Sequence, residues 1–455
     1  MPRRRSGTEK VRPDPGPETH ERWLWRVVAL LVLAIPLMFS PSGKDLFNLP
    51  KDILFRAGMI AIAAILVMAW PSSASLFSRR DWRKPSVAIA LGALAWTAVA
   101  AVFSSDRGIS AVSLATTAAL TLFYLLTLRL AVRQELQAIW LLLVPAILNA
   151  LMVMMQESGL QPLNVERLSY DPHLSTTGFL GNPNVAGAFL TGPALAAVAL
   201  AVATRGRRRY VALATAAVLL VGILASRTLT SLLAYGTGMA AMVAVSSWRM
   251  ALKLAAPALI AAVIFINLYA PLRYRVRSLI HSARTGEYNL LLTNRLTPFL
   301  AAGTMAADHP LLGIGPGTFG HHYFDYKILA EARHPGLVTD IQRSSWSFSF
   351  SEVHNDHLEV LAETGLPGYL LFLGALFILA AGSLPELDQR LRVLTGADPP
   401  VPSGDSRRLH FARILALPLV ASFFVLALAQ FPLQLISTAT AYLFLAALCR
   451  SWCGW

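Results

Sequence analysis

A histidine stands at the junction between a long polar segment and an apolar one. Residues 352–368 read EVHNDHLEVLAETGLPG, and an apolar run follows directly. An imidazole ordinarily titrates near neutral pH, and the carboxylate of Asp356 could orient that of His354 and raise its basicity. Because polar groups close to hydrocarbon are costly to keep, we interpret His354 as a candidate general base, with Asp356 as its partner.

A second histidine follows at a helical spacing. We expect a short helix over residues 353–364, on which His354 and His357 would share a face. A metal site that also uses His321 and His322 is an alternative interpretation. The chain contains no H-E-x-x-H or comparable ligand spacing, so we assign no metal ligands.

Other polar residues lie beside apolar runs and could bind an anion. Arg227 and Arg295 could either extend to the membrane interface or bind phosphate oxygens through a planar, bidentate guanidinium contact. Asn182 and Asn184 precede an apolar run, where one asparagine can cap a helix and the other could contact a sugar or phosphate. The glycine-rich segment 313–320 could form a plain turn or a nest of backbone amides for phosphate.

The composition indicates what kind of protein must position these residues. Of the 455 residues, 55% are hydrophobic and 14% are charged, whereas soluble domains carry roughly 25% charged residues. The fold class that this favours is an all-α polytopic membrane protein. Two cysteines, Cys449 and Cys453, are too few for a disulfide framework or a four-ligand zinc site.

Twelve apolar segments approach the length of about 20 residues that a transmembrane helix needs. They are 25–40, 54–70, 86–103, 110–128, 136–155, 184–202, 210–226, 229–247, 252–270, 366–382, 411–429 and 433–449. If both termini are cytosolic, most Lys and Arg residues fall in cytosolic segments, as the positive-inside rule requires. The net charge of +14 therefore reflects topology and membrane lipid, and we expect no nucleic-acid partner.

This topology divides the chain into four parts. Residues 1–22 form a basic, disordered cytosolic tail, and residues 23–270 hold the first nine spans. Residues 271–365 form one large, partly helical periplasmic loop that carries the histidine motif. Residues 366–455 hold spans ten to twelve.

Four sequence blocks carry a resemblance. HPLLGIGPGTF (309–319) is paired with HNDHLEVLAETGLPG (354–368), and GNPNVAGAFL (181–190) and SRTLTSLLAY (226–235) precede them in the same order. Together they resemble the O-antigen ligase/polymerase superfamily of polytopic glycan transferases. The resemblance is good over roughly residues 180–385, and the first five spans match only in pattern.

The resemblance implies an enzyme of the bacterial inner membrane with a periplasmic active site. Its donor would be a glycan linked to a polyprenyl diphosphate such as undecaprenyl diphosphate, and a ligase would move that glycan onto lipid A–core. By position, His354 would be the essential histidine, and Arg227 and Arg295 the essential arginines. Such a donor arrives activated, so the prediction includes no cofactor and no metal, and inversion at the anomeric carbon is expected.

Three alternatives remain open from the sequence. A related enzyme could polymerise repeat units, with a growing glycan as acceptor, or could glycosylate proteins. A lipid or glycan transporter is a different class, which commonly places ionisable residues near the membrane midplane. Here the middle of most apolar segments is nearly free of charge, which favours the transferase.

Overall fold

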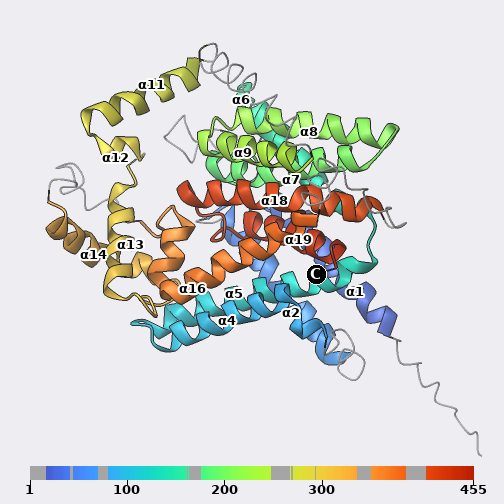
Figure 1. Ribbon diagram of the computed structural model, residues 1–455, viewed down its shortest axis with the longest axis horizontal. Helices are drawn as coiled ribbons and strands as arrows, with labels where there is room; N and C mark the ends of the chain where they lie inside the picture. Colours follow the sequence, from blue (N-terminus) through green and yellow to red (C-terminus); the bar gives the residue numbers. More distant parts are fainter. Residues whose placement is uncertain are drawn as a thin grey trace, which may run out of the picture.

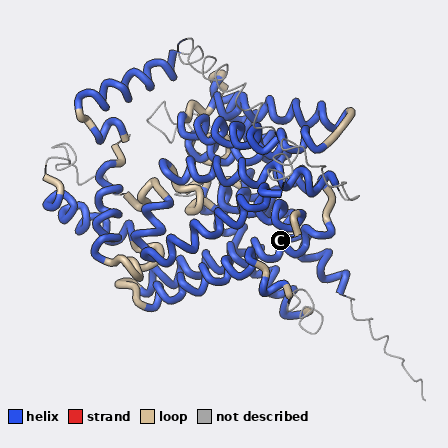
Figure 2. The backbone as a smooth tube through the Cα atoms, in the orientation of Figure 1, coloured by secondary structure: helices blue, strands red, loops and turns tan. Residues whose placement is uncertain are grey.

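The computed structural model describes residues 17–40, 45–69, 80–160, 162, 176–246, 267, 270–292, 294–335, 350–385 and 406–454. Within these ranges the chain forms helices joined by turns and loops, and no strand occurs (Figure 2). Most of the predicted tail, most of the predicted span 252–270, part of the large loop (336–349) and the connector at 386–405 lie outside the described residues.

In the described ranges, the N-terminal half forms eight α-helices and four short 3₁₀ helices. Their bounds are α1 Pro17–Ala34, η1 Ile35–Leu37, α2 Asn48–Met68, η2 Asp81–Arg83, α4 Pro85–Val102, α5 Arg107–Leu130, η3 Ala131–Arg133, η4 Leu136–Ile139, α6 Trp140–Glu157, α7 Pro183–Ala203, α8 Arg207–Ala225 and α9 Leu229–Ser246. Proline occupies the first turn of α4 and α7, where its missing N–H has no intrahelical partner to lose.

The described part of the C-terminal half contributes seven more α-helices and one 3₁₀ turn. They are α11 Ala270–Thr285, α12 Tyr288–Leu291, α13 Leu296–Asp308, α14 Phe319–Arg333, α16 Asp356–Ala380, η7 Ala381–Ser383, α18 Ser406–Ala429 and α19 Ile436–Trp452. In Figure 1, α11 to α14 line one side of the molecule, beside the bundle made by the longer helices.

Within the part of the chain that the structure describes, eight helical segments are long and apolar enough to cross a membrane. They are Pro85–Val102, Arg107–Arg133, Leu136–Glu157, Pro183–Ala203, Arg207–Ala225, Leu229–Ser246, Asp356–Ser383 and Arg407–Ala429. Each coincides with one of the twelve predicted spans. The predicted fold class is confirmed: the chain is an all-α polytopic membrane protein.

Three further predicted spans coincide with helices outside this set. The segment 25–40 contains most of α1 and the 3₁₀ turn η1, and the segment 54–70 lies mainly in α2. The segment 433–449 overlaps α19, which has 17 residues. The count of twelve spans stays a prediction, because the ninth segment is largely outside the described ranges.

Helix α7 forms the centre of the bundle. Nearly all of its side chains are buried, and it packs against α6, α8, α9, α18 and α19. Small residues allow this close packing: a Cβ on Gly187 would lie 2.3 Å from Thr228 Oγ1. The block 181–190 therefore packs directly against the block 226–235.

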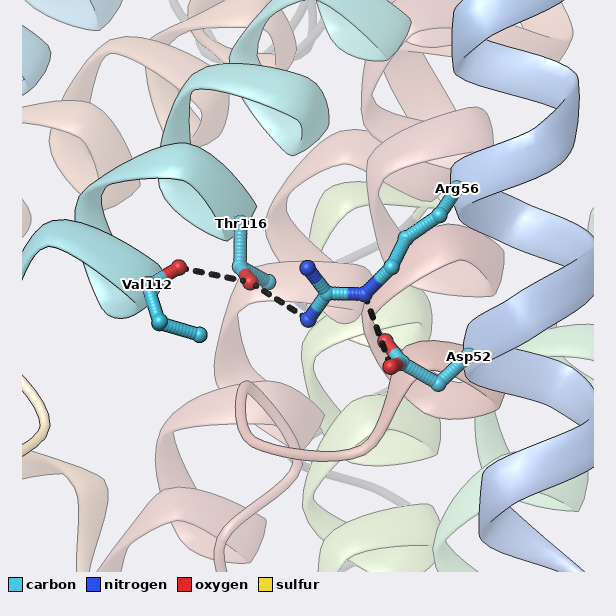
Figure 3. Close-up of polar contacts among 4 residues, drawn as sticks. All are labelled: Asp52, Arg56, Val112 and Thr116. Atoms are coloured by element: carbon cyan, nitrogen blue, oxygen red, sulfur yellow. Dashed lines mark hydrogen bonds and ion pairs between the residues drawn. The ribbon is translucent and has the colours of Figure 1, made fainter. Parts of the chain in front are cut away.

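Polar contacts join α2 to α5 near the N-terminal end of α2 (Figure 3). Arg56 Nε donates to Asp52 Oδ2 over 2.7 Å within α2, and Arg56 Nη2 donates to Thr116 Oγ1 over 3.2 Å. Thr116 in turn donates to the carbonyl of Val112 on its own helix. The predicted span 54–70 thus carries near its start an exposed arginine whose hydrogen bonds go to side chains of α2 and α5.

Helix α16 contains the predicted break between the short helix and the next span. Gly365 has φ 70° and ψ −176°, a conformation that favours glycine, and Pro367 follows it. The helix begins at Asp356 rather than near residue 353, because the side chain of Asn355 caps it by accepting the N–H of Leu358 over 3.0 Å. His354 therefore precedes the helix.

Candidate active site

His354 is held in a strained loop immediately before α16. Its backbone adopts φ 59°, which is uncommon for a residue with a side chain. The ring packs edge-on against Phe350, with ring centroids 5.7 Å apart, and against Phe431, at 4.6 Å. His357 instead packs against Phe424 on α18, at 4.4 Å. The two histidines thus face different surroundings, and the expected shared face is not formed.

His354 opens onto a small cavity that distant parts of the chain build together. Four of the six predicted site residues line it: Asn182, Asn184, Arg295 and His354. The rest of the lining is Val185, Ala188, Gln430, Phe431, Pro432 and Leu435. The start of α7, the start of α13, the loop before α16 and the connector between α18 and α19 therefore meet at one place.

The two asparagines are placed by the start of α7. Asn182 Oδ1 accepts the backbone N–H of Asn184 over 2.8 Å, so Asn182 caps the helix. The capping interpretation thus accounts for the Oδ1 of Asn182. Asn184 is the second residue of the helix; its side chain lines the cavity and does not cap the helix.

Arg295 stands at the start of α13. Asn294 adopts φ 62°, and α13 begins at Leu296. The guanidinium of Arg295 donates to the carbonyl of Ala429 at the end of α18. The arginine thus connects the large loop to the C-terminal helices and presents a fixed positive charge to the cavity.

Burial and charge together determine the protonation state of His354. Removal from water lowers its pKa from 6.5 to about 4, and the nearby charge of Arg295 contributes to the same shift. His354 Nδ1 is buried without a hydrogen-bond partner among the described residues. At neutral pH the imidazole is therefore uncharged and has a nitrogen available to accept a proton.

Asp356 binds the connector between α18 and α19. Its Oδ2 accepts the backbone N–H of Leu433 over 3.0 Å, and the side chain is almost completely buried. No hydrogen bond joins Asp356 to His354 among the described contacts. Asp356 therefore contacts the same connector that carries Phe431, whose ring packs against His354.

The two halves of the paired motif are in direct contact. Gly317 N and Phe319 N donate to the carboxylate of Glu363 over 2.8 and 3.1 Å. Backbone hydrogen bonds from Ile314 N to Ala362 O and from Leu366 N to Pro310 O hold the same two segments together. The glycine-rich segment 313–320 does direct backbone amides at an oxygen ligand, and this ligand is the protein's own Glu363 side chain.

Arg227 lies outside the cavity lining. Its Nε donates to Glu157 Oε1 over 2.9 Å, Nη2 binds the same oxygen, and its side chain is 52% exposed. Its backbone has φ 55°. Gly187 of α7 packs close to Ser226 and Thr228, so this segment lies against the helix that Asn182 caps.

Left-handed backbone recurs at or beside three of the predicted site residues. Within the described ranges, the non-glycine residues with positive φ are Arg227, Asn294 and His354. Two of them are predicted site residues, and the third precedes Arg295. Such conformations cost about 1–3 kcal/mol each and tend to persist at functional sites.

Sequence reasoning missed the connector at residues 430–435. It contributes Gln430 and Phe431 to the cavity, far along the chain from His354. It has no charged residue and joins two apolar segments, so no local pattern distinguished it from an ordinary turn. Among the residues that the structure describes, no group of three or more His, Cys, Asp or Glu is arranged as a metal site.

Comparison with known families supports the resemblance seen in the motifs. A family model described as O-antigen ligase matches residues 195–373. The match includes Arg227, Arg295, His354 and Asp356, and it ends before the connector that carries Gln430. A search of curated proteins found no match. The predicted resemblance to the O-antigen ligase superfamily is thereby confirmed over this region.

Proposed function

We propose that this protein is a glycosyltransferase that moves a glycan from a polyprenyl-diphosphate carrier to an acceptor hydroxyl. The preferred acceptor is lipid A–core, which makes the reaction O-antigen ligation. The observation that carries the proposal is the cavity in which a neutral histidine, an arginine and two asparagines meet. The family match to O-antigen ligase supports the same class of chemistry.

In this proposal His354 acts as the general base. The acceptor oxygen attacks the anomeric carbon, the bond from that carbon to the diphosphate oxygen breaks, and the acceptor proton moves to the free nitrogen of His354. Attack opposite the leaving group inverts the anomeric centre. A base in position contributes about 10²–10⁴-fold to rate.

The leaving group explains why an arginine belongs beside the base. The diphosphate gains negative charge as the bond breaks, and a fixed cation in a desolvated site stabilises that charge. Arg295 also lowers the pKa of His354 in the resting protein. A bound diphosphate would offset the charge of Arg295, raise the pKa of His354 and so strengthen the base when the donor is present. Arg227 would supply a second cation after leaving Glu157.

We place the protein in the bacterial inner membrane, with both termini in the cytosol and the cavity on the periplasmic side. The chemistry assigned to the cavity uses side chains alone, so the proposed reaction is metal-independent. Asn184 and Asn182 would contact the donor near its sugar or phosphate. Asp356 would hold the connector in place.

Reconstitution tests the proposal. Purified protein in nanodiscs is given an undecaprenyl-diphosphate glycan, with and without lipid A–core, and the products are separated by gel. We expect a lipid A–core band shifted by the glycan, formed by the wild type and lost in His354→Ala. A ladder of longer glycans that forms without lipid A–core would show that the enzyme is a polymerase rather than a ligase. Product anomers with retained configuration, measured by NMR, would contradict direct displacement.

A further inference from the structure

Gln430 has a feature that its role as a connector residue does not explain. Its side chain lines the cavity together with His354 and Arg295 and is only 5% exposed. Its Nε2 has no hydrogen-bond partner among the described residues. A buried donor without a partner is unfavourable, and proteins keep few of them. The amide is therefore a donor directed into a site that also holds the proposed base.

The residues on both sides of Gln430 are held by the site itself. Arg295 binds the carbonyl of Ala429, the preceding residue. Phe431, the next residue, packs against the ring of His354, and Leu433 N binds Asp356. Because the base, the arginine and the aspartate all contact this connector, they fix the position of Gln430 relative to the reacting groups.

The chemistry of the carboxamide restricts what it can bind. An amide N–H donates to phosphate or sugar oxygens, and it neither carries charge nor transfers protons at neutral pH. Its neighbour Arg295 already provides the positive charge. A neutral donor beside a cation suits an oxygen-rich ligand whose charge is already compensated.

We propose that Gln430 binds the donor substrate directly, its Nε2 donating a hydrogen bond to an oxygen of the diphosphate or of the sugar attached to it. This inference rests on the proposed function, because it assigns a further contact to the same donor. It extends the site beyond the matched family region to the connector between the last two described helices.

Two variants and one control separate binding from structure. Gln430→Met keeps the length of the side chain and removes the donor, and Gln430→Glu keeps its shape and adds a negative charge. Gln434→Met is the matched control, because Gln434 lies in the same connector, is exposed and does not line the cavity. Binding is measured in nanodiscs with undecaprenyl diphosphate and with the undecaprenyl-diphosphate glycan.

Gln430→Met is expected to weaken donor binding about 10- to 100-fold, the value of a hydrogen bond to a charged group. Gln430→Glu should weaken it further, and Gln434→Met should bind as the wild type does. Weaker binding of both lipids assigns the contact to a phosphate oxygen. Weaker binding of the glycan-loaded lipid alone assigns it to the sugar.

Thermal unfolding in detergent tests whether Gln430 instead stabilises the fold, because the loss of a stabilising side chain would lower the unfolding temperature. Since Nε2 has no partner to lose, Gln430→Met should unfold at or above the temperature of the wild type. A clear drop relative to Gln434→Met, or unchanged binding of both lipids, would overturn the inference. If the wild type binds neither lipid, the proposed function is rejected. If the wild type binds and Gln430→Met binds equally well, only the inference about Gln430 is rejected.

Discussion

Arg295 and Arg227 are the two arginines expected at one diphosphate, and the structure places them in different surroundings. Arg295 lines the cavity, contacts a backbone carbonyl and lowers the pKa of His354. Arg227 is half exposed and pairs with Glu157. Charges act strongly where water is excluded and weakly where it screens them. Arg295 therefore acts on the electrostatics of the resting cavity, whereas in the proposed mechanism Arg227 would act only after its ion pair with Glu157 opens.

The two regions nevertheless share a structural feature. Arg227 and His354 both adopt left-handed backbone, and Asn294 does so immediately before Arg295. Strain at each point must be offset by surrounding contacts such as the Asn355 cap and the packing at Gly187. Surrounding contacts therefore fix the backbone geometry in both regions, while only the region around His354 is shielded from water.

The largest expected effect comes from removing the base. His354→Asn keeps a residue that tolerates left-handed backbone, so the loop should remain in place. We expect turnover to fall about 10²–10⁴-fold with donor binding retained. Single-turnover rates in nanodiscs measure it, and His321→Asn, at an exposed position on α14, is the matched control. Turnover within a few-fold of wild type would remove His354 from the role of base.

The pH profile tests whether the cavity is desolvated. A base must be deprotonated, so activity is lost as pH falls through its pKa. With the pKa of His354 at about 4 in the free protein, kcat/KM should not fall on the acid side until the pH approaches 4. An exposed histidine would already lose about thirty-fold at pH 5.

The same profile reports the influence of the donor. In the proposed mechanism, bound diphosphate raises the pKa of His354, so the acid limb of kcat should lie at higher pH than that of kcat/KM. Coincident limbs near pH 6.5 for both parameters would indicate a solvated histidine that Arg295 does not influence.

The sequence predicted most of the fold because apolar length is a local property. Eight of the predicted spans match helices that meet the length and apolarity of a membrane crossing. The errors lie at helix ends, where capping decides. Asn355 caps α16 and leaves His354 outside the helix, so the spacing of His354 and His357 did not bring them together.

The candidate site could be predicted only in part. His354, Arg295, Asn182 and Asn184 each carry a local signal, and all four line the cavity. Gln430 and Phe431 carry none, because their importance arises from packing between distant segments. The expected pairing of Asp356 with His354 also depended on proximity in sequence, whereas the carboxylate points to Leu433.

A smaller effect is expected where the two regions meet. Gly187→Ala would place a Cβ 2.3 Å from Thr228 Oγ1 and 2.6 Å from Ser231 Oγ. Overpacking of this kind costs about 1–3 kcal/mol, so the unfolding temperature in detergent should fall. Gly236→Ala on α9 is the control, since a Cβ there meets nothing within 4 Å, and it should be neutral or stabilising. Equal unfolding temperatures for the two variants would show that α7 can move away from the Arg227 segment at no cost.

The smallest effect concerns the ion pair of Arg227. Exposed pairs are worth about 0.2–1 kcal/mol, so Glu157→Gln should lower KM for the donor by about two- to five-fold if Arg227 must leave Glu157 to bind the diphosphate. Asp308→Asn breaks the similarly exposed pair with Arg333 and should leave KM unchanged. The gain should shrink at high ionic strength, where the pair is already screened. A KM that Glu157→Gln leaves unchanged at low salt would mean that Arg227 does not compete between Glu157 and the donor, and Arg295 would then be the principal cation at the leaving group.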